Sequence, residues 1–207
     1  MRLIHYINEG LGEIIELSPK EQTILIKKDC KHYLNLTKST GPFNRAVGEI
    51  ITTTEIIKKK VRLDRTSLGM NQGVFDKFNK WLQKNGHIRR DKAVSASSSG
   101  PSLQKFGNVG YFFPIGKFNY TWVKTKDINM DDIKGGWRQN EVDLFFFNQE
   151  IEYKHQIPTN KEFIELSIKN FPKFFTTNKG IETAHKNKFE IWFDCKEYYI
   201  VNRKNKI

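Results

Sequence analysis

Two aromatic-rich runs in the second half of the chain do most to limit what it can fold into. Residues 109–115 (VGYFFPI) and 117–123 (KFNYTWV) are separated by a single glycine, and residues 189–201 (FEIWFDCKEYYIV) hold two more such runs around a short Asp-Cys-Lys connection. Aromatic and β-branched runs bounded by turn residues are typical of strands. We expect these segments to form mixed or antiparallel sheets whose aromatic side chains fill the core.

Helical signals lie between and before these runs. Ser18-Pro19-Lys20-Glu21 forms a capping box, which predicts a helix from about 19 to 35. Val74, Phe78, Trp81 and Leu82 share one helical face, and Gly86 follows as a stop signal. A further short helix is expected over 179–187. Helices mixed irregularly with strands, without a βαβ rhythm, predict the α+β class.

Five other segments give weaker patterns. Residues 2–7 (RLIHYI) and 61–65 (VRLDR) alternate as strands do, and 142–147 (VDLFFF) resumes an apolar strand pattern. Thr159–Glu162 forms a second capping box that opens a helix. Residues 43–60 permit either strand or helix.

The chain has 207 residues and no linker rich in Pro, Gly or Ser, which favours a single domain. Within it, residues 1–60 are expected to be mainly helical and 61–207 to form the core. Cys30 and Cys195 form no C-x-x-C pair, so neither a zinc site nor a disulfide framework is indicated, and a reducing compartment is expected. No apolar run approaches the roughly 18–20 residues of a membrane span, and the first residues do not resemble a signal peptide.

The net charge of +12 raises the question of a polyanionic partner. The basic clusters are short and far apart: 58–60, Arg89-Arg90 and 203–206. They fit a basic nucleic-acid-binding module, but they also fit an ordinary solvated surface, which is the preferred interpretation.

Three polar signals follow one another along the chain. Arg62 and Arg65 lie in the strand-like run 61–65, Ser95 and Ser97 lie at the end of a short strand, and Glu190 begins a late strand. The chain lacks G-x-x-x-x-G-K-[ST], G-x-G-x-x-G and H-E-x-x-H, which disfavours the enzyme classes that depend on those motifs.

This order resembles the mono-ADP-ribosyltransferases, especially the small ones of T-even-like phages, in which an arginine precedes a serine motif and a late glutamate. DKAVSASSSG at 91–100 is similar to the serine motif, and Glu190 is placed like the glutamate of that family. The chain also resembles tailed-phage proteins that combine R-x-D-R (62–65), FPIGxF (113–118) and a terminal glutamate followed by Tyr-Tyr (190–199).

The resemblance implies NAD as cofactor and a host protein or nucleic acid as acceptor. Breaking the nicotinamide–ribose bond builds oxocarbenium charge, which the carboxylate of Glu190 would stabilise. Arg62 or Arg65 would hold the pyrophosphate, and strand alternation would let only one of them do so. Ser95 and Ser97 would orient the ribose and the glutamate.

Alternatives remain at this stage. The family has Glu-x-Glu or Gln-x-Glu, whereas Lys188 lies two residues before Glu190, and a literal Glu-x-Glu ends at Glu152. Glu190 also shares a strand face with Trp192 and Asp194, which an exposed face would explain. A virion protein, with this fold but an inactive site and contacts to other virion proteins, is the second hypothesis, and nucleic-acid binding the third. Either location, host cytoplasm or virion, fits a phage protein.

Overall fold

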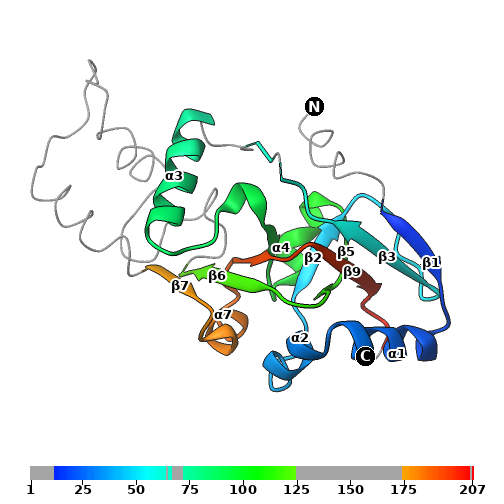
Figure 1. Cartoon of the computed structure of the whole chain (residues 1–207). Helices are drawn as coiled ribbons and strands as arrows, with labels where there is room; N and C mark the ends of the chain where they lie inside the picture. The colour runs from blue at the N-terminus through cyan, green and yellow to red at the C-terminus, as the bar shows by residue number, and fades with distance from the viewer. Residues whose placement is uncertain (1–11, 64, 67–71, 125–173, 206) are drawn as a thin grey trace, which may run out of the picture.

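The computed structural model describes residues 12–63, 65–66, 72–124, 174–205 and 207 (Figure 1). Within these residues the chain forms two antiparallel sheets and several short helices, which confirms the α+β prediction. The strands expected at 2–7 and 142–147, the capping box at Thr159–Glu162 and the candidate Glu152 lie outside the described residues. No described helix is long and apolar enough to span a membrane.

The larger sheet has five strands in the order β1-β3-β9-β5-β2. These are β1 (Glu13–Glu16), β3 (Glu55–Lys60), β9 (Glu197–Asn202), β5 (Asn108–Pro114) and β2 (Asn44–Val47). β9 lies in the centre, where Ile200 pairs with Ile57 on one side and with Phe112 on the other. The ambiguous stretch 43–60 therefore supplies two strands of this sheet.

The smaller sheet has four strands in the order β4-β8-β6-β7. These are β4 (Val94–Ala96), β8 (Ile191–Asp194), β6 (Asn119–Val123) and β7 (Phe175–Thr177). β8 and β9 adjoin in sequence but belong to different sheets, so the Asp-Cys-Lys connection carries the chain from one sheet to the other. The same holds for β5 and β6, on either side of Gly116.

The predicted helices that fall on described residues are present, with one difference. α1 (Pro19–Asp29) begins at the expected capping box, with Ser18 and Glu21 bonded reciprocally. The helix predicted to reach residue 35 is divided at Cys30, and α2 (Lys31–Leu36) follows. α3 (Gln72–Lys84) and α7 (Ile181–Lys186) match the predicted helices, and Gly86 has the positive φ of 74° that suits a residue after a helix end. A short α4 (Gly100–Leu103) follows β4.

The strand predicted at 61–65 is wrong, because β3 ends at Lys60 and no strand is assigned to the described residues of that segment. Val61 donates its amide to Lys196 O at 3.0 Å, and the chain then leaves the sheet. The argument that strand alternation separates Arg62 from Arg65 therefore does not apply.

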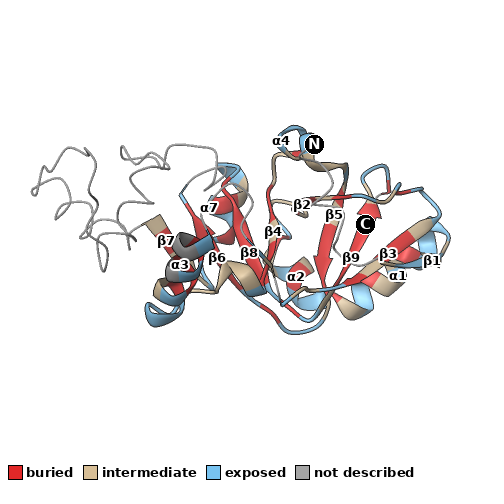
Figure 2. Ribbon diagram, turned by 90° about the horizontal axis from the view of Figure 1, so that it is seen from above, coloured by how far each residue is buried: buried red, intermediate tan, exposed pale blue. Residues whose placement is uncertain are grey.

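Two buried clusters hold the elements together (Figure 2). The larger cluster joins α1 and α2 to both sheets. Within it the Tyr33 ring packs edge-on against two others, with its centroid 6.3 Å from that of Phe112 and 5.9 Å from that of Phe193. The smaller cluster lies between α3 and the opposite face of the small sheet, where Phe78 meets Trp192 at 6.0 Å. The aromatic runs serve as core, as expected, and the small sheet is covered on both faces.

Candidate functional site

The two sheets meet where β4 of the small sheet approaches β2 of the large one (Figure 2). Asn44 of β2 and Ser97, directly after β4, exchange backbone hydrogen bonds of 2.7 and 3.0 Å. Side chains from both sheets therefore converge on β4. We call the polar side chains gathered there the β4 site: Arg45, Arg65, Arg90, Ser95, Ser97 and Glu190.

Glu190 lies directly before β8 and is 6% exposed. Its Oε1 accepts hydrogen bonds from Arg90 Nη2 at 3.1 Å and from Trp192 Nε1 at 2.7 Å. The Arg90 guanidinium also lies over the Trp192 ring, 5.8 Å from its centroid. A buried carboxylate is costly unless it is paired and hydrogen-bonded, and Arg90 and Trp192 meet that need.

The interpretation of Glu190 as a residue of an exposed face is wrong. Glu190 and Trp192 do share a face of the small sheet, but α3 packs on that face and Trp192 is fully buried. The alternation of the sequence located the face correctly. It could not reveal that a helix more than one hundred residues earlier in the chain covers it.

Ser95 and Ser97 lie on the same face of the small sheet as Glu190. Ser95 pairs in register with Trp192, and continuing the antiparallel register from Ala96–Ile191 sets Ser97 opposite Glu190. Ser97 Oγ accepts a hydrogen bond from the Ser99 amide at 3.2 Å. Ser95 Oγ is buried and finds no hydrogen-bond partner in the described part of the chain. A buried hydroxyl in this state has unused capacity for a ligand.

Arg65 approaches the same strand from its beginning. Its Nη1 donates to Ala93 O at 2.6 Å, one residue before β4. Arg62 is also half-buried, two residues past the end of β3. Of the two arginines expected to bind a pyrophosphate, Arg65 thus bonds to the residue directly before β4.

A third arginine escaped the sequence analysis. Arg45 on β2 is 7% exposed, and its Nη1 donates to Ser95 O at 2.6 Å. Its guanidinium lies 5.7 Å from the centroid of the Tyr198 ring. The sequence does hold a signal for Arg45, which is the spacing of Phe43, Arg45 and Val47. Residues two apart in an extended segment lie on the same face, and a charged residue between two apolar ones on that face indicates a buried polar role.

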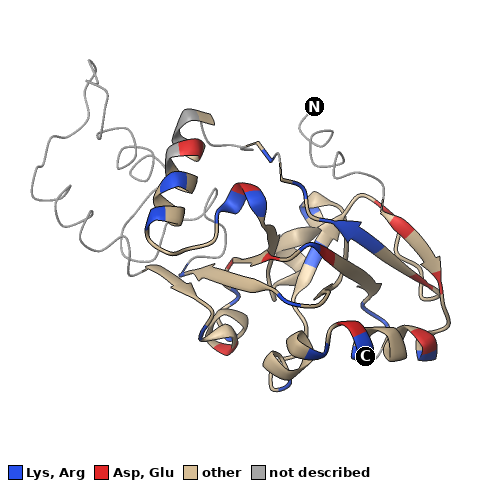
Figure 3. Cartoon of the chain, in the orientation of Figure 1, with Lys and Arg blue, Asp and Glu red and all other residues tan. Residues whose placement is uncertain are grey.

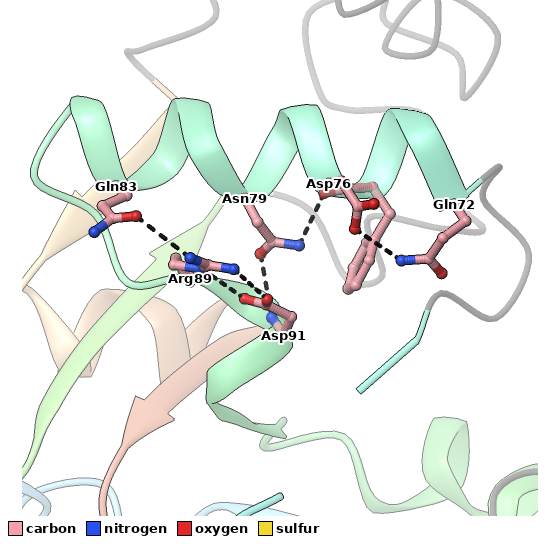
Figure 4. A network of polar contacts seen from close by, with 7 residues as sticks. Gln72, Asp76, Asn79, Gln83, Arg89 and Asp91 are labelled. Carbon is pink, nitrogen blue, oxygen red and sulfur yellow. Dashed lines mark hydrogen bonds and ion pairs between the residues drawn. The ribbon is translucent and has the colours of Figure 1, made fainter. Parts of the chain in front are cut away.

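Arg90 was also missed as a site residue, since it stood out only as part of a charged pair. A polar network fixes the turn that carries it, the 3₁₀ helix Arg90–Lys92, to α3 (Figure 4). Asp91 N donates to Asn79 Oδ1 at 3.1 Å, and Arg89 Nε donates to Asp91 Oδ1 at 3.0 Å. Arg89 Nη1 also donates a hydrogen bond to Gln83 Oε1 at 3.4 Å. The helix thus positions Arg90 above Glu190.

The β4 site is strongly positive. Figure 3 shows basic residues on β3, on the segment after it, in the turn before β4 and on β2. Three guanidinium groups bond at or beside β4: Arg45 to Ser95 O, Arg65 to Ala93 O, and Arg90 to the carboxylate of Glu190. Lys59 on β3 is buried too, but its charge is balanced by Glu49, whose Oε1 lies 2.6 Å from Lys59 Nζ. This excess of cationic, hydrogen-bonding groups suits an anionic ligand such as a phosphate.

Within the described ranges, no group of His, Cys, Asp and Glu side chains could hold a metal ion. Comparisons of the chain with protein-family models, with curated proteins and with solved structures found no match.

Proposed function

We propose that the chain is an ADP-ribosyltransferase-like enzyme that uses NAD to modify a host macromolecule. The observation that carries the proposal is that Arg65, Ser95, Ser97 and Glu190 all lie along β4, with Arg65 bonded to Ala93 O at its beginning and Glu190 opposite Ser97 just past its end. These residues come from three separate segments, and the resemblance requires this combination: an arginine, a serine motif and a glutamate.

The chemistry assigns each group a role. Loss of nicotinamide leaves positive charge on the ribose carbon, and the Glu190 carboxylate would stabilise it by accepting a hydrogen bond from a ribose hydroxyl. Ser95 Oγ, which lacks a partner among the described residues, would bond the ribose. The guanidinium of Arg65 would hold the pyrophosphate, aided by Arg45, whose guanidinium bonds to a carbonyl two residues further along the same segment.

A second candidate function rests on the same carboxylate. Glu190 is already held by Arg90 and Trp192 and is almost fully buried. In a virion protein that keeps the fold without the reaction, this ion pair would serve folding alone.

NAD turnover by the purified chain, with and without host-cell lysate, tests the proposal. We expect Glu190→Gln to lower the rate by about 100-fold or more, because one group that stabilises the transition state is lost. Glu190→Asp keeps the charge opposite Arg90 and should also lose most activity, since its carboxylate is set back by one methylene. The matched control is Glu182→Gln, an exposed residue of α7, which should be fully active. Thermal unfolding of each variant checks the fold.

Each other outcome has a defined meaning. Loss of activity in Glu152→Gln, with Glu190→Gln active, would move the catalytic carboxylate to residue 152. A wild-type chain that binds NAD without consuming it would support the inactive fold. A wild-type chain that neither binds nor consumes NAD overturns the proposal.

A further inference from the structure

Two hollows adjoin at the end of the small sheet that lies away from Glu190. The first has a volume of about 670 Å³ and is lined by His32, Phe118 and Lys117, among others. The second, about 480 Å³, is bordered by the end of α3 and the turn at Gly86. Asn119 and Asp194 line both hollows and pair directly in the sheet. We call the two hollows together the basic groove.

Positive charge runs along both parts of the groove. Lys117 and Lys196 line the first hollow, and Arg89 and Lys92 line the second. Asp194 carries the one negative charge among the described lining residues. Arg89 is paired with Asp91, but the three lysines are exposed and form no ion pair within the described part of the chain. Their charge is therefore available to a partner.

The groove also offers neutral hydrogen-bonding groups and a ring. Asn119, Thr177 and Asn178 also line the second hollow, where Asn178 Nδ2 donates to Asn119 Oδ1 at 2.9 Å and the Thr177 hydroxyl bonds to Thr121 and His87. The exposed His32 ring lies against Phe118, with centroids 5.0 Å apart. Cations along a track, with a ring and neutral polar groups beside them, are what single-stranded nucleic acid needs for its phosphates and bases. An acidic polypeptide would use the cations alone.

The one cysteine that lines the groove, Cys195, does not make it a site for thiol chemistry. Cys195 lines the first hollow, but burial, with the neighbouring Asp194 carboxylate, raises the pKa of its thiol to about 12. At neutral pH the thiol stays protonated, and a protonated thiol is a poor nucleophile. The groove is thus a binding surface rather than a thiol site.

We propose that the basic groove binds single-stranded nucleic acid, with Lys117 and Lys196 contacting phosphates in the first hollow and Lys92 in the second. Each hollow has the size that holds a ligand of about one or two nucleotides. The groove and Glu190 lie at opposite ends of β8, so this inference does not rest on the proposed transferase activity.

Fluorescence anisotropy with a labelled single-stranded oligonucleotide of about 12 nucleotides tests the groove without NAD. The groove variant is Lys117→Gln/Lys196→Gln. The matched control is Lys20→Gln/Lys186→Gln, which removes the same charge from exposed lysines of α1 and α7 that do not line the groove. Loss of two phosphate contacts should weaken binding roughly 10- to 30-fold at about 0.1 M salt, and flatten the slope of log K against log salt by about 1.4. The control should change little.

Three results would overturn the proposal. The first is no binding of the oligonucleotide by the wild-type chain at about 0.1 M salt. The second is equal weakening in the groove variant and the control, which would mean diffuse attraction by net charge. The third is tighter binding of polyglutamate than of the oligonucleotide, with the same dependence on Lys117 and Lys196, which would assign the groove to acidic proteins.

Discussion

The two carboxylates at the ends of β8 differ more than their positions suggest. Glu190 and Asp194 lie on the same face of the same small sheet, four residues apart. Glu190 is buried and held by Arg90 and Trp192, whereas Asp194 is exposed and lines the basic groove. α3 accounts for the difference, because it packs over Trp192 and its end borders the groove at Gly86.

Burial therefore decides what each carboxylate can do. Removing a partner from a buried charge leaves an uncompensated ion, which is expensive, while an exposed charge keeps its water and acts mainly through its field. The Glu190 end should respond to mutation in stability and catalysis. The Asp194 end should respond in binding and salt dependence.

The largest effect should come from breaking the buried ion pair. Arg90→Met keeps much of the packing on Trp192 but removes the Arg90 cation from the buried Glu190 carboxylate. We expect the free energy of unfolding to fall by about 3–5 kcal/mol, measured by urea denaturation. The matched control is Arg89→Met, whose pair with Asp91 is more exposed and should contribute no more than about 1 kcal/mol.

A second variant separates charge from packing at the same place. Glu190→Leu/Arg90→Met removes both charges and should recover most of the stability lost in Arg90→Met, because no ion is left buried alone. Equal losses in Arg90→Met and Arg89→Met would show that the buried Arg90–Glu190 pair contributes no more to stability than the more exposed Arg89–Asp91 pair.

Much of the fold follows from the sequence alone. The capping box at Ser18, the apolar face that carries Phe78, and the aromatic runs at 109–123 and 189–201 each gave the correct element. These signals are local, since a cap or a repeating apolar position acts within one helix or strand. The error at 61–65 has a physical reason too. Alternation of apolar and charged residues over a segment this short is not specific to strands. A strand forms only where a neighbouring strand takes up its backbone hydrogen bonds.

The candidate site was harder to predict than the fold. Ser95, Ser97 and Glu190 were found as single residues, but their meeting depends on the pairing of β4 with β8, which are far apart in the chain. Arg45 and Arg90 were not found, because their partners lie on other elements. A buried arginine looks like a surface arginine until the sheets are assembled.

Acid should weaken the fold through His87, beside the groove. His87 is half-buried against Trp81 and Phe175, and this burial lowers its pKa below the ordinary value of about 6.5. The unfolded chain therefore takes up a proton first. The stabilising contribution of neutral His87 is present above about pH 6.5 and is lost as the pH falls below it.

Urea denaturation at a series of pH values checks this sign. His87→Gln should unfold with a weaker loss of stability on acidification than the wild type, whatever its stability at neutral pH. His185, whose pKa burial also lowers, would add to the slope, and replacing the exposed His32 by Gln serves as the control. An unchanged slope in His87→Gln would assign the acid sensitivity to other groups.

The smallest effect on stability should come from Asp194, at the other end of the comparison. Asp194→Asn should change the free energy of unfolding by no more than about 0.5 kcal/mol, because the side chain is exposed. The same change removes a negative charge from the groove, so the single-stranded oligonucleotide should bind about two- to fivefold more tightly at low salt. Glu182→Gln, which removes an exposed carboxylate from α7, should leave the affinity nearly unchanged. Equal affinities in both variants would mean that Asp194 does not face bound phosphate, and the two ends of β8 would then differ in burial but not in function.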